Sequence, residues 1–288
     1  MQKILETDLI LREGAVYHLG LRPENLAKKI ITVGDPDRVG EVSRHFDSMH
    51  FSNRHREFVT HTGRIGKNEI SVISTGMGTD NIEILMTELD ALVNVDLERR
   101  EALPNPVKLE IIRIGTSGSL QPGIPADSIL VSELAFGLDT LMCFYPYQLK
   151  ESDRSLSAAL QEAAGIPFLP CVVRPDKGLL ETVGRDMIRG NTLTCPGFYA
   201  PQGRSVRLSP ARKNLLGAYR NFRFEETVIT NFEMETAGYY AMGELLGHRM
   251  LSVNAIVANR ANDEFSSDPQ ACIRKAIEMV LERMEALP

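Results

Sequence analysis

Short apolar runs alternate with longer segments of helical periodicity along most of the chain, and this alternation constrains the fold more than any other feature. The apolar runs are typical of buried strands and comprise residues 29–33, 69–74, 109–114, 128–131, 227–230 and 249–258. The amphipathic segments are typical of helices and comprise residues 80–95, 152–164, 235–246 and 269–287. Strands and helices that alternate in this way predict a three-layer α/β/α sandwich with a central mixed, largely parallel sheet.

Capping and turn residues support these boundaries. The helix N-caps and helix ends are expected at Asp80, Asp268, Gly165 and Gly247. Residues 58–66 and 69–75 alternate in polarity around the turn residues Gly66-Lys67-Asn68, which predicts a hairpin. The stretch 173–191 is rich in Pro, Gly and charge and is expected to be a surface excursion. The sequence contains no linker, low-complexity tract or internal repeat, so residues 1–288 are expected to form a single domain.

Charge and hydropathy exclude several classes of partner. The net charge is −6 and the pI is near 5.6, whereas binding to a nucleic-acid backbone usually shows as a basic excess. The apolar stretch 251–258 is far shorter than the roughly 20 residues that span a bilayer, and residues 1–10 lack a signal-peptide core. We therefore expect a cytoplasmic protein that binds neither nucleic acid nor membrane and holds any anion at a local site.

The cysteines and histidines predict no metal centre. The four cysteines are scattered without metal-ligand or disulfide-framework spacing, at Cys143, Cys171, Cys195 and Cys272. No pair of the six histidines lies at helical ligand spacing beside a carboxylate. We expect free thiols and no catalytic metal.

Two glycine-containing segments follow predicted strands and offer donors to an anion. The first, Gly34-Asp35-Pro36-Asp37-Arg38, provides backbone N–H groups and a guanidinium, although Asp35 and Pro36 would equally suit a simple helix cap. In the second, Arg113-Ile114-Gly115-Thr116-Ser117-Gly118, a buried strand ends in an arginine, two hydroxyls and two glycines. It lacks both the dinucleotide-binding frame and the P-loop lysine, so it favours a simple oxyanion.

The segment Asn231-Phe232-Glu233-Met234-Glu235 places two carboxylates around a methionine at a strand-to-helix junction. A carboxylate there can accept hydrogen bonds from a vicinal diol, and the methionine can pack on the apolar face of a sugar. Acidic residues are also favoured at helix starts by the helix dipole, so these residues alone leave both readings open.

Four segments occur in the order found in nucleoside phosphorylases, namely GDPDRV at 34–39, HREF at 55–58, RIGTSG at 113–118 and NFEMET at 231–236. The sequence resembles the uridine phosphorylases of that family from residue 17 to residue 260. The resemblance implies reversible phosphorolysis of uridine to uracil and ribose 1-phosphate. It implies inorganic phosphate as co-substrate and no cofactor.

The resemblance also implies roles for individual residues. The phosphate-binding residues would be Gly34, Arg38, Arg56, Arg113 and Thr116. His18 would reach the nucleoside 5′-hydroxyl, and both His18 and Arg56 would enter the site of a neighbouring subunit. Thr116, Met234 and Glu235 would contact the nucleoside, with Glu235 on the ribose hydroxyls and Glu233 as a weaker candidate beside it. The active unit would then be a homodimer, or a hexamer built from dimers, with shared sites.

The base is expected to bind a segment that resembles the uracil-recognition loop of uridine phosphorylases. In this segment Gln202 can pair with the uracil N3–H and a carbonyl, Arg204 can donate to the other carbonyl, and Phe198 can stack on the ring. Purine phosphorylases and nucleosidases of the family carry an acid near the end of a later strand, where this sequence has Arg260. Arg113, Gln202, Arg204 and Arg260 are therefore the predicted catalytic residues. A purine nucleoside phosphorylase or nucleosidase of the same fold is the alternative, and a binding protein without turnover is a more distant one.

Overall fold

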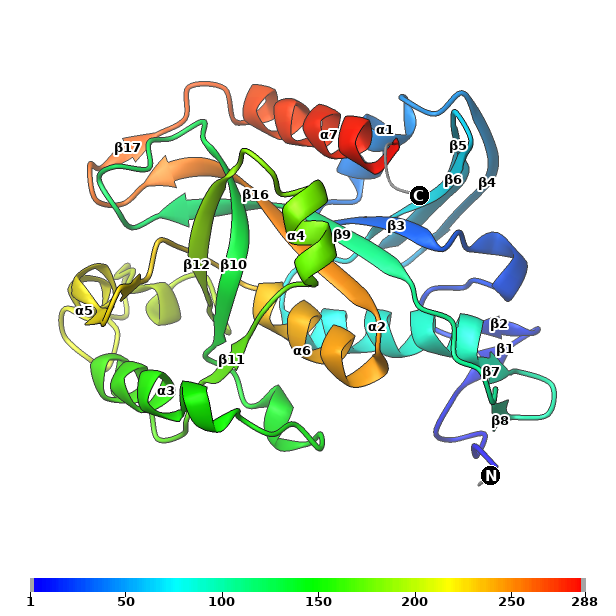
Figure 1. The fold of residues 1–288 in the computed structure, drawn as a ribbon, viewed down its shortest axis with the longest axis horizontal. Helices are drawn as coiled ribbons and strands as arrows, with labels where there is room; N and C mark the ends of the chain where they lie inside the picture. Colours follow the sequence, from blue (N-terminus) through cyan, green and yellow to red (C-terminus); the bar gives the residue numbers. More distant parts are fainter. Residues whose placement is uncertain (1–2, 286–288) are drawn as a thin grey trace.

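The computed structural model describes residues 3–285 and has one large mixed sheet at its centre (Figure 1). The strand order is β17-β16-β10-β12-β15-β9-β3-β6-β5-β4, and β11 pairs with β10 outside this path. The strands of this sheet are β3 (Lys29–Val33), β4 (Ser48–His55), β5 (Phe58–Ile65), β6 (Asn68–Ser74), β9 (Glu110–Ser119), β10 (Ile129–Gly137), β11 (Cys171–Val173), β12 (Ile188–Thr194), β15 (Asn231–Glu233), β16 (Arg249–Asn259) and β17 (Glu264–Phe265). The α/β sandwich with a mixed, largely parallel sheet is confirmed.

Helices cover the sheet on two sides, and three short hairpins lie outside it (Figure 1). The helices are α1 (Asp37–Ser43), α2 (Thr79–Asn94), α3 (Glu151–Ala164), α4 (Lys177–Thr182), α5 (Leu215–Asn221), α6 (Thr236–Leu246) and α7 (Pro269–Glu285), with short 3-10 turns at Pro23–Asn25, Leu141–Cys143 and Ala200–Gln202. The hairpins are β1 (Leu11–Arg12) with β2 (Ala15–Val16), β7 (Val95–Asp96) with β8 (Glu101–Ala102), and β13 (Arg223–Phe224) with β14 (Thr227–Val228). Among residues 3–285, no helix combines the length and the apolarity needed to cross a membrane.

Alternating burial along the long strands places helices on both faces. On β9, Ile112 and Ile114 join the core under α7, whereas Ile111 joins the core under α2 and α6. The period of two along a strand accounts for this division. A third core fills the space between β10, β12, β15, α3 and α5.

Part of the sheet closes on itself. Strand β16 pairs in parallel with β9 and antiparallel with β10, and the path β10-β12-β15 returns to β9. The ring brings the ends of β9, β15 and β16 close together, which a continuous open sheet would not do.

Several predicted elements need correction. The strand predicted at 128–131 is β10, which continues to Gly137. The run 227–230 is not a strand of the sheet: it contains β14, and the paired strand β15 begins at Asn231. The strand predicted at 109–114 continues to Ser119, because Gly115–Ser119 stay paired with β16. The stretch 173–191 is not an irregular excursion, since it contains α4, with Leu179 and Leu180 buried, and the start of β12. Gly78, rather than Asp80, is the N-cap of α2.

Other local predictions are confirmed. The hairpin forms between β5 and β6, and Gly66 has the positive φ of 55° that its turn requires. Gly165 and Gly247 end α3 and α6 in the left-handed conformation. The Asp268 carboxylate accepts from the Ala271 N–H, as an N-cap does.

Candidate active site

A cavity of about 500 Å³ opens where β3, β6, β9, β15 and β16 end. Its wall brings together segments that are far apart in the sequence: Gly34–Pro36 and Arg38, Gly76–Met77, Arg113, Gly115–Gly118, Phe198, Gln202, Arg204, Phe232–Glu235, Val257–Ala258 and Phe265. Most of the predicted site residues therefore meet at one place. His18 and Arg56 are not in this wall, and neither is Arg260.

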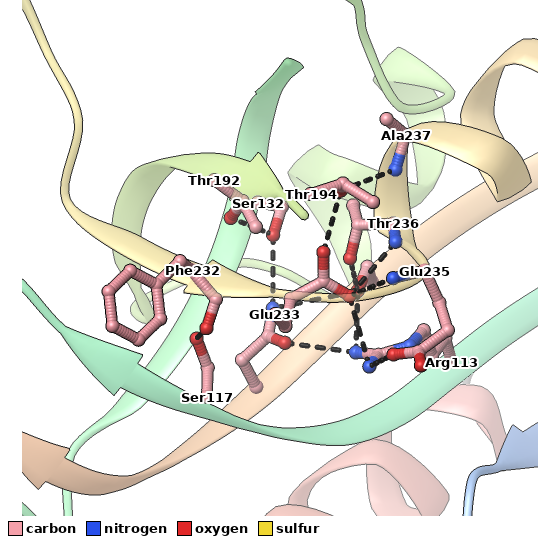
Figure 2. A network of polar contacts seen from close by, with 12 residues as sticks. Arg113, Ser117, Ser132, Thr192, Thr194, Phe232, Glu233, Glu235, Thr236 and Ala237 are labelled. Carbon is pink, nitrogen blue, oxygen red and sulfur yellow. Dashed lines mark hydrogen bonds and ion pairs between the residues drawn. The ribbon is translucent and has the colours of Figure 1, made fainter. Parts of the chain in front are cut away.

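Arg113 is the centre of a buried polar network at the floor of this cavity (Figure 2). Its Nη2 atom lies 2.6 Å from Oε2 of Glu235 and 3.0 Å from Oε2 of Glu233. Its Nη1 atom donates to Asn254 Oδ1 at 2.9 Å. Burial alone would lower the pKa of Arg113, but the two carboxylates more than offset this and raise it. The guanidinium is thus charged and fixed in place.

Gly115 leaves the space that this guanidinium fills. Residues two apart on a strand point to the same face, and a Cβ at position 115 would overlap the Arg113 guanidinium. The strand can therefore carry a buried arginine toward the cavity because the next residue on that face has no side chain.

The Glu233 carboxylate is buried and accepts hydrogen bonds from neighbouring groups of the protein. Its Oε1 accepts from Thr194 Oγ1 at 2.6 Å, and its Oε2 accepts from the backbone N–H groups of Glu235 and Thr236 at 3.0 and 2.9 Å (Figure 2). Burial raises the pKa of Glu233, and Arg113 opposes this rise. The predicted contact of Glu233 with the nucleoside remains a prediction, while its contacts here orient Arg113 and the first turn of α6.

Glu235 connects strand β9 to the loop before α2. Its Oε2 pairs with Arg113, and its Oε1 accepts from the Gly78 N–H at 2.8 Å. Gly78 has φ 98° and ψ 157°, a conformation that essentially only glycine adopts. The loop before α2 therefore supports Glu235, a contact that sequence reasoning missed. The signal was Gly76-Met77-Gly78 itself, where Met77 is 75% exposed at the cavity rim.

Arg38 and Thr116 lie on the same side of the cavity as Arg113. The Arg38 Nη1 atom is 3.5 Å from the Ile114 carbonyl oxygen. Burial lowers the pKa of Arg38, Asp35 partly opposes this, and the neighbouring Arg113 lowers it further. Two guanidinium groups therefore lie at this end of the cavity, where both can donate hydrogen bonds to an oxyanion.

The opposite end of the cavity carries the predicted base-binding groups. Gln202 is 2% exposed, and its Oε1 accepts from Arg204. Arg204 also donates to the Phe198 carbonyl oxygen at 2.6 Å and lies over the Phe198 ring, 3.8 Å from its centroid. Burial and the nearby Arg260 lower the pKa of Arg204 to about 10.

Arg260 lies behind this end, with its guanidinium 5.9 Å from the Phe232 ring centroid. No group in residues 3–285 hydrogen-bonds its buried Nη1 atom, and burial lowers its pKa. Phe232 also faces Arg204 at 5.5 Å, so it is a wall residue between two cations. Sequence reasoning did not assign Phe232 to the base, although it lies inside the NFEMET segment.

His18 and Arg56 both lie next to Tyr17, outside the cavity wall. His18 Nδ1 contacts Glu88 Oε1 at 2.6 Å, and Arg56 Nη2 donates to the Tyr17 hydroxyl at 3.3 Å. Neither side chain reaches the cavity of its own chain.

A partly closed α/β sheet with an arginine-lined cavity at its strand ends describes the class of protein, and comparisons with known proteins identify its family. The chain belongs to the phosphorylase superfamily, whose family model matches residues 28–287. It is 31% identical to a uridine phosphorylase of Thermococcus kodakarensis, over 88% of this chain and 80% of that protein. It is 28% identical to a uridine phosphorylase of Escherichia coli, over 86% and 88%.

A solved structure is also similar over nearly its whole length. It is a nucleoside phosphorylase of Trypanosoma brucei, described as showing uridine phosphorylase activity, with a TM-score of 0.88 and 27% identity. The match covers 97% of this chain and 100% of that one. The resemblance inferred from the sequence motifs is therefore confirmed at the level of the whole chain.

Proposed function

We propose that this protein is a uridine phosphorylase that converts uridine and inorganic phosphate reversibly into uracil and ribose 1-phosphate. The observation that carries the proposal is the division of one cavity into two ends. Arg38 and Arg113, which can donate to an anion, lie at one end, and Gln202 and Arg204 lie at the other. The relatives that are named uridine phosphorylases support the same activity.

In the proposed reaction, phosphate bound by Gly34, Arg38, Arg113 and Thr116 attacks C1′ of the ribose while the glycosidic bond loosens. Glu235 would hold the ribose hydroxyls, and Met234 would pack on the sugar. Phosphate is itself the nucleophile, so the step needs no covalent enzyme intermediate and no cofactor. Holding phosphate beside C1′ replaces an encounter in solution by a fixed geometry.

Uracil departs with developing negative charge, and the cationic base end would stabilise that charge. Arg204 and Arg260 are both partly desolvated and close to each other, which raises the cost of leaving their charges uncompensated. Preorganised donors of this kind typically contribute about 2.7–4 kcal/mol each to the transition state. Among the described residues of the cavity wall, the carboxylates are Asp35, Glu233 and Glu235, and the two glutamates are paired with Arg113. This arrangement disfavours purines, which need a proton donor at N7.

We propose further that the working unit is a cytoplasmic homodimer or a hexamer of dimers. The support is the position of His18 and Arg56, which contact Glu88 and Tyr17 outside the cavity of their own chain. In a shared-site assembly these two residues would complete the neighbour's site.

A substrate panel tests the activity. Purified protein is incubated with uridine, cytidine, inosine or adenosine, with and without phosphate, and the free base and ribose 1-phosphate are quantified. We expect phosphate-dependent release of uracil and discrimination against the other nucleosides of up to about 10⁴-fold, because mismatched bases leave buried polar groups unpaired. Cleavage of inosine at the rate of uridine, or release of base without phosphate, would refute the proposal.

A further inference from the structure

Glu88 is a charged residue on the buried face of α2. Its neighbours on that face are Ile82, Leu85, Leu89 and Leu92, and Glu88 itself is 6% exposed. A buried carboxylate is costly unless hydrogen-bond donors surround it. The residue therefore needs a structural partner that can balance this cost.

The partner is the segment that carries His18. Glu88 accepts from the His18 backbone N–H at 3.0 Å and from the Leu19 N–H at 2.8 Å. Its Oε1 also lies 2.6 Å from His18 Nδ1. One carboxylate thus holds the backbone and the ring of His18 together.

These contacts assign the two ring nitrogens of His18. An ionised carboxylate can only accept, so Nδ1 must carry the hydrogen in this contact. Nε2 is then the nitrogen that remains for a ligand, as in sites where a carboxylate fixes the orientation of a functional histidine. The His18 side chain is 29% exposed, so a ligand can reach it.

Arg56, which also lies outside the cavity of its own chain, belongs to the same group of contacts as His18. The Tyr17 ring packs edge-on against the His18 ring, with centroids 5.0 Å apart, and the Arg56 guanidinium lies 5.3 Å from the Tyr17 centroid. Arg56 lies in the turn between β4 and β5 and has a φ of 57°, which is uncommon for a residue other than glycine. His18 and Arg56 are therefore presented as one unit.

We infer that Glu88 is a positioning residue for substrate selection: it orients His18 so that Nε2 contacts the 5′-hydroxyl of a nucleoside bound in the neighbouring subunit. This inference rests on the proposed function. The new element is Glu88: a residue of helix α2 becomes a determinant of the preference for nucleosides that carry a 5′-hydroxyl.

The test compares uridine with 5′-deoxyuridine, which lacks only the group that His18 would contact. We expect the wild-type protein to favour uridine in kcat/KM by about 10-fold, the effect of one good hydrogen bond. The ratio of kcat/KM for uridine to kcat/KM for 5′-deoxyuridine should fall in Glu88→Gln to about its value in His18→Ala. The reason is that an amide nitrogen facing Nδ1 disturbs the orientation of the His18 ring. The kcat/KM for 5′-deoxyuridine should stay within about threefold of the wild type.

Glu83→Gln is the matched control, since Glu83 is a carboxylate on the same helix that contacts Tyr145 instead of His18. It should leave the ratio at the wild-type value. In a His18→Ala background, Glu88→Gln should cause no further loss of discrimination.

The following outcomes would overturn the inference. Glu88→Gln could keep the wild-type ratio of the two kcat/KM values, and an equal loss for both substrates would then show a purely structural role. His18→Ala could also keep that ratio. If Glu88→Gln does not fold, Glu88→Asp is expected to reduce the ratio with the charge retained, and an unchanged ratio would count against the inference. None of these results resembles a failure of the proposed function, which would show as no uracil release from uridine by the wild-type protein.

Discussion

At the scale of single residues, Arg113 combines two tasks that its contacts make inseparable. It offers a cation to the anion end of the cavity, and it neutralises Glu233 and Glu235, which are both buried. Removing one partner of a buried ion pair typically costs about 3–5 kcal/mol, because the remaining charge is left uncompensated. A variant of Arg113 will therefore change stability as well as activity.

We predict that Arg113→Ala abolishes saturable phosphate dependence and also lowers the free energy of unfolding, by about 3–5 kcal/mol. Urea denaturation and phosphate-dependent uracil release measure the two effects separately. Adding Glu233→Gln should recover part of the stability, since one uncompensated carboxylate becomes neutral, without restoring activity. Near-normal turnover with a saturable phosphate response in Arg113→Ala would contradict the role in binding.

The sequence indicated Arg113 because a buried strand seldom carries an arginine, but it could not indicate what holds the guanidinium. The supports are Ser252 and Asn254, at 3.3 and 2.9 Å, which come from β16 and lie far along the chain. Their position follows from the parallel register that pairs Arg113 with Ser252. Register depends on tertiary packing, so no local pattern contains it.

At the scale of elements, the loop before α2 and the start of α6 are joined by the Gly78 to Glu235 hydrogen bond. Position 78 has a φ of 98°, and a Cβ there would lie 2.7 Å from the carboxylate of Asp80. We predict that Gly78→Ala destabilises the fold by about 1–3 kcal/mol and lowers kcat/KM for uridine, because it displaces the support of Glu235. Thermal unfolding and steady-state kinetics measure these effects.

Gly40→Ala is the control for the Gly78→Ala substitution. Gly40 lies in α1, and nothing lies within 4 Å of a Cβ built there. This substitution should be neutral or stabilising by up to about 1 kcal/mol, with activity retained. If both substitutions lowered stability and kcat/KM equally, the conformation of Gly78 would have no special role.

The first turn of α3 provides a pH-dependent prediction. Asp153 accepts from both terminal nitrogens of Arg174 at 2.7 Å, and this hydrogen bonding lowers the pKa of Asp153 below its ordinary value of 3.8. A carboxyl group with a depressed pKa stabilises the fold above its ordinary pKa and loses that effect as the pH falls through the folded value. Asp153→Asn should therefore cost about 1 kcal/mol or less near pH 7, since Arg174 is partly exposed.

The difference between the wild type and Asp153→Asn should shrink below about pH 4. Urea denaturation at several pH values measures it. A difference that stays constant down to pH 2.5 would show that the ion pair is not its source.

The long helices were predictable to within one or two residues wherever the structure describes their ends, because each buries one stripe and exposes the other. Residues 286 and 287 of the predicted last helix lie outside the described residues. The three-residue strand β15 was misplaced, because Asn231–Glu233 is buried throughout and too short to show a period. Pairing with β12 and β9 defines this strand.

At the scale of the whole molecule, the ring formed by β9, β16, β10, β12 and β15 decides where the cavity lies, and the sequence could not show it. Alternating strands and helices fit an open sheet as well as a partly closed one. Closure requires β9 to pair with both β15 and β16, the two ends of the path β16-β10-β12-β15, and no local pattern of hydrophobic residues encodes that. Most of the predicted site residues nevertheless line one cavity, because their motifs lie at strand ends in either arrangement.

The proposed shared site leads to a prediction about assemblies. Arg38 lines the cavity of its own chain, whereas Arg56 does not. We predict that Arg38→Ala and Arg56→Ala are each severely impaired, and that mixing them under subunit exchange restores activity. In a mixed dimer, the Arg56→Ala chain keeps its own Arg38 and receives an intact Arg56 from its partner. Random exchange between equal amounts would make about a quarter of all sites complete.

A second mixture separates this effect from general stabilisation by mixing. Arg38 and Arg113 both belong to the cavity of one chain, so every site in a mixture of Arg38→Ala with Arg113→Ala lacks one of them. That mixture should show no recovery. Uracil release is followed while a tag on one variant confirms that exchange has occurred. Because the two arginines of the first mixture can meet only across an interface, demonstrated exchange without recovery would mean that Arg56 does not serve a neighbouring site.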